Sequence, residues 1–310
     1  MGAVLVVLPV FLVIALGYLL HLKCFFSPQT MTENNRLLYY LAMPAILFRG
    51  VMNARFDTVP NTSLFALSVC LPYAITTLLV WVFARKGETR ERFATLTLSA
   101  TRGNHFFAGL PILALAMGSE GVEAGAITLA FSLPFLQFTS IGSGQLALLG
   151  KVTLRSLGLT ALRLFKNPLF LSCLFALVLV FGGLGPMPKW VDSTLKILAD
   201  ISTGLALLML GAKIQLASFF SAALKTWKML LFKQIIHPIV FYLVLRAFGL
   251  PDLIVQAGTL LAAMPEAVNT AIIAREMGMD DEYCAMGTTA SVLLSMFTLP
   301  VWIALLGAVQ

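Results

Sequence analysis

Two short polar segments interrupt long apolar stretches of this sequence. The first lies within residues 98–111 and contains Arg102, Gly103, Asn104, His105, Gly109 and Pro111. The second lies within residues 262–270 and contains Pro265, Glu266, Asn269 and Thr270. Glycine weakens a helix, and proline removes an N–H and clashes with the preceding turn, so two broken helices are predicted here. The predicted helix-breaking residues are Gly103, Gly109, Pro111 and Pro265.

The side chains in these segments suit the binding of a small organic anion. Arg102 presents a guanidinium, which can hold a carboxylate through two parallel hydrogen bonds. Asn104 and Asn269 offer amide donors without a fixed charge, although a buried asparagine can instead cap a broken helix end. His105 has the side chain best suited to relay protons near neutral pH, or it is a hydrogen-bonded core residue. The predicted substrate-binding residues are Arg102, Asn104, His105 and Asn269.

Glu266 is the acidic residue of the second segment, and it has two interpretations. If the segment lies in a membrane, a charge there costs at least about 2.5–3.5 kcal/mol and needs a partner. Glu266 could pair with Arg102 and hold the two broken helices together. It could also bind a coupling ion, a sodium ion or a proton, with Asn104 and Thr270 beside it. The two interpretations are compatible if the substrate displaces the pair.

Motifs for catalysis or nucleotide hydrolysis are absent from the sequence. It contains no GxxxxGK[ST] phosphate loop, no HExxH motif and no serine nucleophile elbow. The four cysteines are widely separated, with no CxxC pair, which indicates neither a disulfide framework nor a zinc site. We therefore expect no enzymatic activity and no cofactor other than a coupling ion.

The composition of the chain predicts the helices that position these segments. Hydrophobic residues make up 59% of the 310 residues and charged residues only 11%, whereas an average soluble domain carries about 25% charged residues. Apolar runs of about 20 residues, long enough to cross a bilayer, fill the chain. We predict an all-α integral membrane protein with ten transmembrane helices. The predicted spans are residues 3–22, 36–53, 62–84, 92–117, 122–149, 166–184, 193–215, 226–248, 253–275 and 281–308.

Basic residues are distributed unevenly between the predicted loops. Those in the odd-numbered loops are Lys23, Arg36, Arg85, Lys86, Arg90, Arg92, Lys151, Arg155, Arg163, Lys166, Lys213, Lys225, Lys228 and Arg275. Those in the even-numbered loops are Arg49, Arg55, Lys189 and Arg246. Loops rich in lysine and arginine stay in the cytoplasm, so both termini are predicted on the non-cytoplasmic side. Because topology accounts for the net charge of +7, no nucleic-acid partner is expected.

The two halves of the chain resemble each other at a shift of 160 residues. The aligned pairs are Ala114 with Ala274, Met117 with Met277, Gly118 with Gly278, Glu120 with Asp280 and Thr128 with Thr288. Each half, 1–150 and 151–310, then holds five spans, and this odd number turns the second half upside down. Inverted repeats with corresponding broken helices, here spans 4 and 9, are typical of transporters with a binding site at the midplane. Chance similarity between apolar sequences is the alternative.

These features predict a secondary transporter for a small mono- or dicarboxylate, with the binding site where spans 4 and 9 cross. Access to that site would alternate between the two sides of the membrane. A membrane sensor that binds the same ligand without moving it is one alternative, although it would normally need a cytoplasmic output module. A passive anion channel is another.

Several motifs are similar to those of the auxin efflux carrier family, and the similarity extends over nearly the whole chain. They are residues 8–12 (LPVFL), 16–18 (LGY), 39–48 (YYLAMPAILF), Asn104 followed by 109–111 (GLP), 262–265 (AAMP), 274–276 (ARE) and 298–300 (TLP). The family includes the plant PIN-type auxin exporters and, in bacteria, candidate malonate transporters.

The resemblance implies the inverted-repeat fold that is also found in bile acid sodium symporters. Spans 1, 2, 6 and 7 would form a scaffold, which could also join a homodimer, and spans 3–5 and 8–10 would move like an elevator. Asn104 would contact the substrate carboxylate, and the protein would lie in the lipid bilayer of a bacterial inner membrane.

This sequence also departs from the plant exporters. It lacks their long cytoplasmic loop, it has Glu266 where they have an uncharged residue, and it has the adjacent Arg102. These departures argue against auxin itself as the substrate. Glu266 is similar to the sodium-binding glutamate of the bile acid symporters, although the spacing of its polar neighbours differs, so the coupling ion is left open between sodium and the proton.

Overall fold

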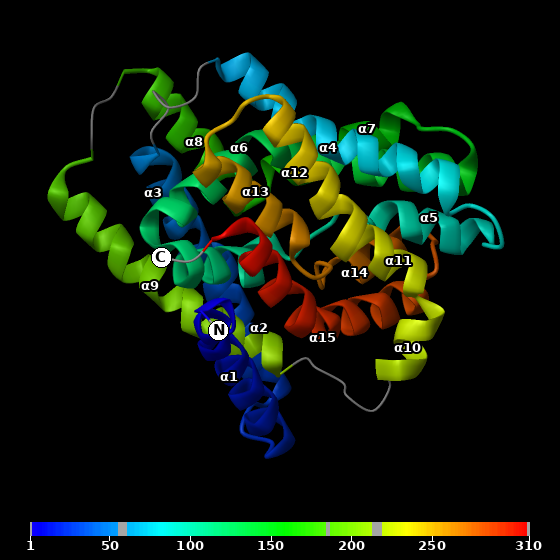
Figure 1. The fold of residues 1–310 in the computed structure, drawn as a ribbon, viewed down its shortest axis with the longest axis horizontal. Helices are drawn as coiled ribbons and strands as arrows, with labels where there is room; N and C mark the ends of the chain where they lie inside the picture. Colours follow the sequence, from blue (N-terminus) through cyan, green and yellow to red (C-terminus); the bar gives the residue numbers. More distant parts are fainter. Residues whose placement is uncertain (1, 55–60, 184–186, 213–218, 309–310) are drawn as a thin grey trace.

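The computed structural model describes residues 2–54, 61–183, 187–212 and 219–308, and its regular elements there are all helical (Figure 1). The first half contains α1 (Gly2–Leu22), α2 (Pro28–Leu37), η1 (Leu38–Ala42), α3 (Met43–Asn53), α4 (Thr62–Phe83), α5 (Arg90–Ser99), η3 (His105–Gly109) and α6 (Leu110–Leu149), where η marks a π-helical turn. The second half contains α7 (Leu154–Phe165), α8 (Pro168–Phe181), α9 (Lys189–Gly211), α10 (Phe219–Lys225), α11 (Trp227–Leu231), η5 (Phe232–Ile236), α12 (His237–Ala247), α13 (Asp252–Ala263), α14 (Thr270–Glu276) and α15 (Asp281–Leu306). The all-α prediction is confirmed for these residues. Arg55, Lys213 and the predicted span ends at 184 and 213–215 lie outside them.

Several helical stretches are long and apolar enough to cross a membrane. Within the described ranges they are the five stretches Thr62–Phe83, His105–Leu149, Lys189–Gly211, Trp227–Ala247 and Asp281–Leu306, and the bent pair Leu157–Phe165 and Pro168–Phe181 would add a sixth. Large apolar side chains cover their outer surface, as at Phe297 and Leu305, which are 70% and 72% exposed. Such a surface suits contact with lipid. The protein is therefore a multi-pass membrane protein, and the count of ten spans stays a prediction.

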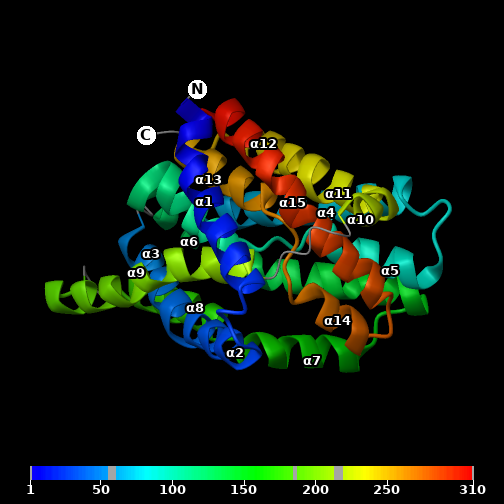
Figure 2. The same cartoon turned by 90° about the horizontal axis from the view of Figure 1, so that it is seen from below.

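The helices form two groups that lie beside each other (Figures 1 and 2). One group contains α1, α3, α8 and α9, which pack on one another, and the other contains α4, α5, α12 and α15. The long helix α6 contacts both α3 and α5, and α13 contacts α6 and α12. Because the polar segments adjoin α6 and α13, they lie between the two groups.

The 40-residue helix α6 contains the end of predicted span 4 and all of predicted span 5. The chain turns at Gly118, which has a φ of 64°. Glycine adopts this left-handed conformation without the steric cost that a side chain would bring. Gly278, its counterpart in the predicted repeat, has a φ of 73° between α14 and α15. Both glycines thus turn the chain shortly after a polar segment.

Helix α7 lies in a region for which the sequence predicted only a loop between spans 5 and 6. Its leucines alternate with Arg155 and Arg163 at helical spacing, which makes it amphipathic, but it is too short and too polar to be recognised as a span. The chain bends by 72° between α7 and α8. Asn167 fixes this bend, because its side-chain oxygen accepts the N–H of Leu169 at 2.9 Å and caps α8.

Three π-helical turns each precede a proline by two residues: η1 before Pro44, η3 before Pro111 and η5 before Pro238. Proline lacks an N–H and its ring clashes with the carbonyl four residues earlier, and a wider turn relieves that clash. At η5 the carbonyl of Gln234, four residues before Pro238, accepts the indole N–H of Trp302 at 3.0 Å. One prediction needs correction, since Gly109 and Pro111 distort the helix without breaking it.

Helices α1 and α9 approach each other at two glycines. A Cβ atom at Gly17 would overlap the backbone of Leu208, and one at Gly211 would overlap the backbone of Ile14. Small residues allow helix backbones to meet closely inside a membrane, where packing contacts replace the hydrophobic effect as the driving force. These two glycines therefore set the distance between α1 and α9.

We predict that Gly211→Ala lowers the thermal unfolding temperature of the detergent-solubilised protein, because overpacking of a tight contact costs about 1–3 kcal/mol. Gly204→Ala in the same helix is the matched control, since a Cβ there meets nothing within 4 Å. The control should unfold at the wild-type temperature or above it, because alanine favours a helix over glycine by about 1 kcal/mol. Equal unfolding temperatures for the two variants would contradict this account of the α1–α9 contact.

Candidate functional site

The two polar segments meet as a pair of chain breaks. Helix α5 ends at Ser99 and the helix resumes at His105, while α13 ends at Ala263 and α14 begins at Thr270. The N–H of Asn104 donates to the carbonyl of Pro265 at 2.7 Å, and the N–H of Ala267 donates to the carbonyl of Arg102 at 3.0 Å. This isolated antiparallel bridge pairs Gly103 with Glu266. Each break would leave backbone N–H and C=O groups unpaired, and here these groups form hydrogen bonds with each other. Such pairing is required in the interior of a membrane protein, because no water is available there.

Gly103 is required by the tight fit of the bridge. A Cβ atom at this position would lie 2.5 Å from Nε2 of His105 and 3.3 Å from the carbonyl oxygen of Leu261. Gly103 and Pro265 therefore lie in the breaks, as the sequence predicted. Proline suits its position because its N–H is not needed there, while its carbonyl accepts the bond from Asn104.

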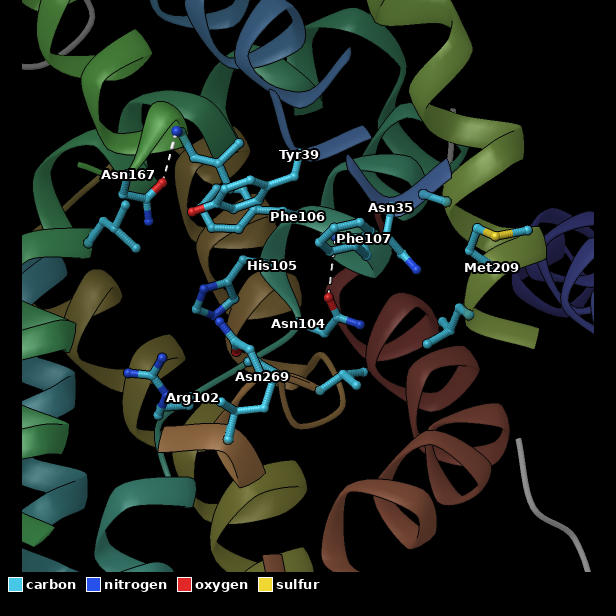
Figure 3. Close-up of a pocket in the computed structure, with 18 of the residues that line it drawn as sticks. Asn35, Tyr39, Arg102, Asn104, His105, Phe106, Phe107, Asn167, Met209 and Asn269 are labelled. Atoms are coloured by element: carbon cyan, nitrogen blue, oxygen red, sulfur yellow. Dashed lines mark hydrogen bonds between the residues drawn. The ribbon is translucent and has the colours of Figure 1, made fainter. Parts of the chain in front are cut away.

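A cavity of about 530 Å³ lies against one side of the bridge (Figure 3). Elements on one side contribute to its lining: α2 with Thr32, Asn35 and Arg36, η1 with Tyr39 and Tyr40, α8 and its cap with Leu169 and Asn167, and α9 with Ala206, Met209 and Leu210. The bridge and its surroundings contribute Arg102, Gly103, Asn104, His105, Phe106, Phe107, Leu133, Leu136, Gln137, Ala267, Val268, Asn269 and Ile272. A mostly apolar lining with a few convergent polar groups is typical of a small-molecule site. All four predicted substrate-binding residues lie here.

Arg102 is a buried cation with no acid bonded to it. Its side chain is only 4% exposed, and Nη1 donates to Oε1 of Gln137 at 2.6 Å and to Oγ of Ser140 at 3.1 Å. Both partners are neutral, so they hold the guanidinium in place without neutralising its charge. Among the described residues, Nε of Arg102 has no hydrogen-bond partner, and no ion pair joins Arg102 to Glu266. The ion-pair interpretation is therefore not the arrangement found.

Asn104 combines the two roles that the sequence left open. Its side-chain oxygen accepts the N–H of Phe107 at 3.3 Å and so caps the helix that starts at His105 (Figure 3). Its amide nitrogen Nδ2 is buried and has no partner in the described part of the chain. The cap fixes the orientation of the amide, and the free donor is available to an acceptor in the cavity.

Two further polar side chains complete this wall of the cavity. His105 is 1% exposed, and its Nε2 has no partner within the residues described. Asn269 precedes α14 without capping it through its side chain, and it lines the same cavity as Arg102 and His105 (Figure 3). A buried polar group left without a partner costs about 1–3 kcal/mol. A ligand that carries oxygen acceptors would satisfy Arg102 and Asn104 together, which is what a carboxylate offers.

Glu266 and Thr270 do not line the cavity. Glu266 is fully buried behind the bridge, where its carboxylate accepts the hydroxyl of Thr288 at 3.1 Å and the thiol of Cys284 at 3.4 Å. Its backbone N–H donates to Oγ of Ser291 at 3.0 Å. Asn104 lines the cavity whereas the carboxylate of Glu266 bonds to α15, and the ion site of Glu266, Asn104 and Thr270 stays a prediction. The backbone bridge separates the two sides.

Sequence reasoning missed three residues of this region. Gln137 and Ser140, three positions apart on α6, hold Arg102, and nothing in the sequence ties them to it. Lys233 is fully buried in η5, and its Nζ donates to the carbonyl of Ala262 at 2.6 Å. The signal for Lys233 was present, since a lysine inside a predicted apolar span needs a partner.

Comparison with known proteins places the chain among transporters. The family model described as "Membrane transport protein" matches residues 3–139 and 139–303. A "Putative malonate transporter" of Rhizobium meliloti (strain 1021) is 26% identical over 303 residues, which cover 94% of this chain and 92% of that protein. An "Uncharacterized transporter" of Methanothermobacter thermautotrophicus is 24% identical over 305 residues, with coverage of 97% and 98%. The broken helices and their cavity thus occur in a chain that belongs to the membrane transport protein family, the auxin efflux carrier family.

Proposed function

We propose that the protein is a secondary transporter of a small organic anion, a mono- or dicarboxylate, which binds in the cavity beside the backbone bridge. The observation that carries the proposal is that Arg102 and Asn104 line one cavity and that each has a buried donor without a partner among the described residues, in a chain of the membrane transport family. The fixed positive charge of Arg102 favours anions over neutral solutes. The donors are satisfied only when an acceptor enters the cavity.

The substrate proposal has two supports of different kinds. The Rhizobium relative is named for malonate, a short dicarboxylate. The cavity itself has aromatic side chains, among them Tyr39, Phe106 and Phe107, beside its polar wall. An acid with an apolar body, such as an auxin-like acid, would use both surfaces. Malonate and an aromatic monocarboxylate are therefore the two probes to compare.

We propose ten spans in two inverted repeats, 1–150 and 151–310. Supporting this, α5 and α13 are of similar length, each is followed by a break, and a left-handed glycine, Gly118 or Gly278, follows each broken segment. The group of α1, α3, α8 and α9 would be the scaffold, and the group around the bridge would move relative to it like an elevator. Because the cavity lies between the two groups, such movement would change the side to which it opens.

The remaining features of the proposal concern location and coupling. The chain would lie in a bacterial inner membrane with both termini outside the cytoplasm, and its scaffold could join a homodimer. Arg36, which lines the cavity, was counted with the first predicted cytoplasmic loop, and Asn167 lies at the start of the span that follows the fifth, so the cavity would face the cytoplasm here. Glu266 is the buried carboxylate available for coupling to a proton or a sodium ion. A sensor that binds without transport would show saturable binding without flux.

We predict that Arg102→Gln reduces counterflow of labelled malonate or indole acetate in proteoliposomes by at least about tenfold, because loss of a charge-assisted hydrogen bond costs about 1.5–3 kcal/mol. Arg246→Gln is the control, since Arg246 forms an exposed ion pair with Asp252 away from the cavity. The control should transport at the wild-type rate. Unchanged transport by Arg102→Gln would remove Arg102 from the binding site.

The variant Asn104→Asp tests whether Asn104 binds the substrate or only caps the helix that starts at His105. Aspartate keeps an oxygen that can accept the N–H of Phe107, so the helix start is retained. It also replaces the free amide donor with a negative charge that repels a carboxylate. We expect the helix start to be retained and anion binding to be lost, as measured by titration calorimetry in detergent. Carboxylate affinity equal to that of the wild type would assign Asn104 a purely structural role.

A further inference from the structure

Helix α7 links the two groups of helices. It follows α6, which contacts both groups, and it precedes α8, which belongs to the group of α1, α3 and α9. Figure 2 shows α7 at the lower edge of the molecule. On this edge Arg163 of α7 forms an ion pair with Glu276 of α14 at 2.8 Å. One side of α7 is thus held by the protein, and its outer side meets the surroundings.

The two sides of α7 differ in burial. Thr160 and Leu164 lie one turn apart, are only 6% and 5% exposed, and belong to the side that packs on the protein. Leu154 and Phe165 are 88% and 58% exposed. They are eleven residues apart, which places them on one face of a helix with 3.6 residues per turn, and Gly158 lies on this face between them. The outer side of α7 therefore presents an apolar face with no cover from the described residues.

Basic side chains lie beside this apolar face. Lys151, Arg155 and Lys166 are exposed, at the start of α7, within it and just after it. Among the residues that the structure describes, no ion pair joins these three side chains to an acid. A helix with an apolar face and unpaired basic residues is typical of a segment that lies on a membrane of negative charge.

The direction of α7 fits this position. Its 12 residues extend over about 18 Å, which is shorter than the roughly 30 Å of a hydrocarbon core. The chain bends by 72° between α7 and α8. Because the cosine of 72° is about 0.3, only about a third of the length of α7 runs along the axis of α8. If α8 enters the membrane, α7 runs mainly along the membrane surface.

A single bent span of α7 and α8 is the alternative arrangement. It would place Arg155 and Arg163 in the hydrocarbon region, where a charged side chain is costly. At the membrane interface both guanidinium groups stay in contact with water and headgroups. The positions of these two arginines therefore favour the interface.

We propose that α7 is an interfacial helix that binds anionic phospholipids. The face of Leu154, Gly158 and Phe165 would lie against the acyl chains, and Lys151, Arg155 and Lys166 would bind the headgroups. Basic residues beside a span attract such lipids because the cytoplasmic leaflet is negatively charged. The occupant is the membrane surface because α8 begins at Pro168, directly after α7 and its basic residues. This proposal does not rest on the proposed transport function.

The first test measures the depth of a spin label on Gly158→Cys in vesicles of phosphatidylcholine and phosphatidylglycerol. A Cβ atom at Gly158 meets nothing within 4 Å, so the label disturbs no contact. The background carries Cys24→Ser and Cys70→Ser, because Cys24 is exposed and Cys70 partly exposed, whereas Cys173 and Cys284 are buried. We expect more collisions with oxygen than with a water-soluble nickel chelate, at a depth of about 5–10 Å.

Two further labels calibrate this depth. Gly204→Cys is the matched control for the membrane interior, since a Cβ there also meets nothing within 4 Å and Gly204 is exposed on α9, which is long enough to cross a membrane. Lys86→Cys, in the exposed turn between α4 and α5, is the control for water. Nickel access at Gly158 equal to that at Lys86 would place α7 outside the lipid. A depth equal to that at Gly204 would make α7 part of a bent span, and either result would overturn the proposal.

The second test concerns the headgroups. The triple variant Lys151→Gln, Arg155→Gln and Lys166→Gln should bind phosphatidylglycerol at least about fivefold more weakly than the wild type, because each basic residue near an anionic surface contributes to binding. Native mass spectrometry of the full chain, titrated with phosphatidylglycerol or with phosphatidylcholine in detergent, measures this affinity. Binding of phosphatidylcholine, which has no net charge, should not change.

The control for net charge is a second triple variant, Lys189→Gln, Lys196→Gln and Arg246→Gln. Lys189 is exposed at the start of α9, and the other two residues form exposed ion pairs away from α7. This variant should retain wild-type affinity for phosphatidylglycerol. An equal loss in both triple variants, or no loss in either, would overturn the assignment of the headgroup site to α7.

Discussion

The two hydrogen bonds between the backbone around Gly103 and the backbone around Glu266 are the contact on which the rest of this structure depends. Breaking a helix inside a membrane leaves donors and acceptors that neither lipid nor the helix can satisfy. Here backbone groups at the break between α5 and η3 form hydrogen bonds with backbone groups at the break between α13 and α14. The bridge therefore permits an irregular backbone in the interior and fixes two distant parts of the chain against one another.

The bridge also divides the polar groups between two environments. On one side, Arg102 and Asn104 line a cavity, and each has a buried donor that lacks a partner in the described part of the chain. On the other, Glu266 is enclosed and its carboxylate has partners on α15. Unsatisfied donors favour a ligand, whereas a satisfied and enclosed cluster favours stability of the fold. The two breaks thus contribute both to a binding surface and to its support.

The helices around the bridge carry further distortions that have a common cause. Each π turn in η1, η3 and η5 accommodates a proline two residues later. The wider turns redirect side chains, and Tyr39 in η1 and His105 in η3 both line the cavity. Proline placement therefore influences which residues face the cavity, although the prolines themselves, such as Pro44, lie outside it.

The sequence alone determined that the chain is helical and apolar and where the polar segments lie, and it grouped Arg102, Asn104, His105 and Asn269, which all line the cavity. The composition, and the cost of placing polar residues in apolar runs, depend only on the order of residues along the chain. They can therefore be judged from the sequence. Only the tertiary structure decided that Glu266 faces away from Asn104, that Arg102 bonds to α6 and that Lys233 stands beside Ala262. These depend on how backbones cross and on the direction of each side chain at the break. The helical repeat predicts the direction of a side chain only where the helix is continuous, so it cannot predict the direction of side chains at a break.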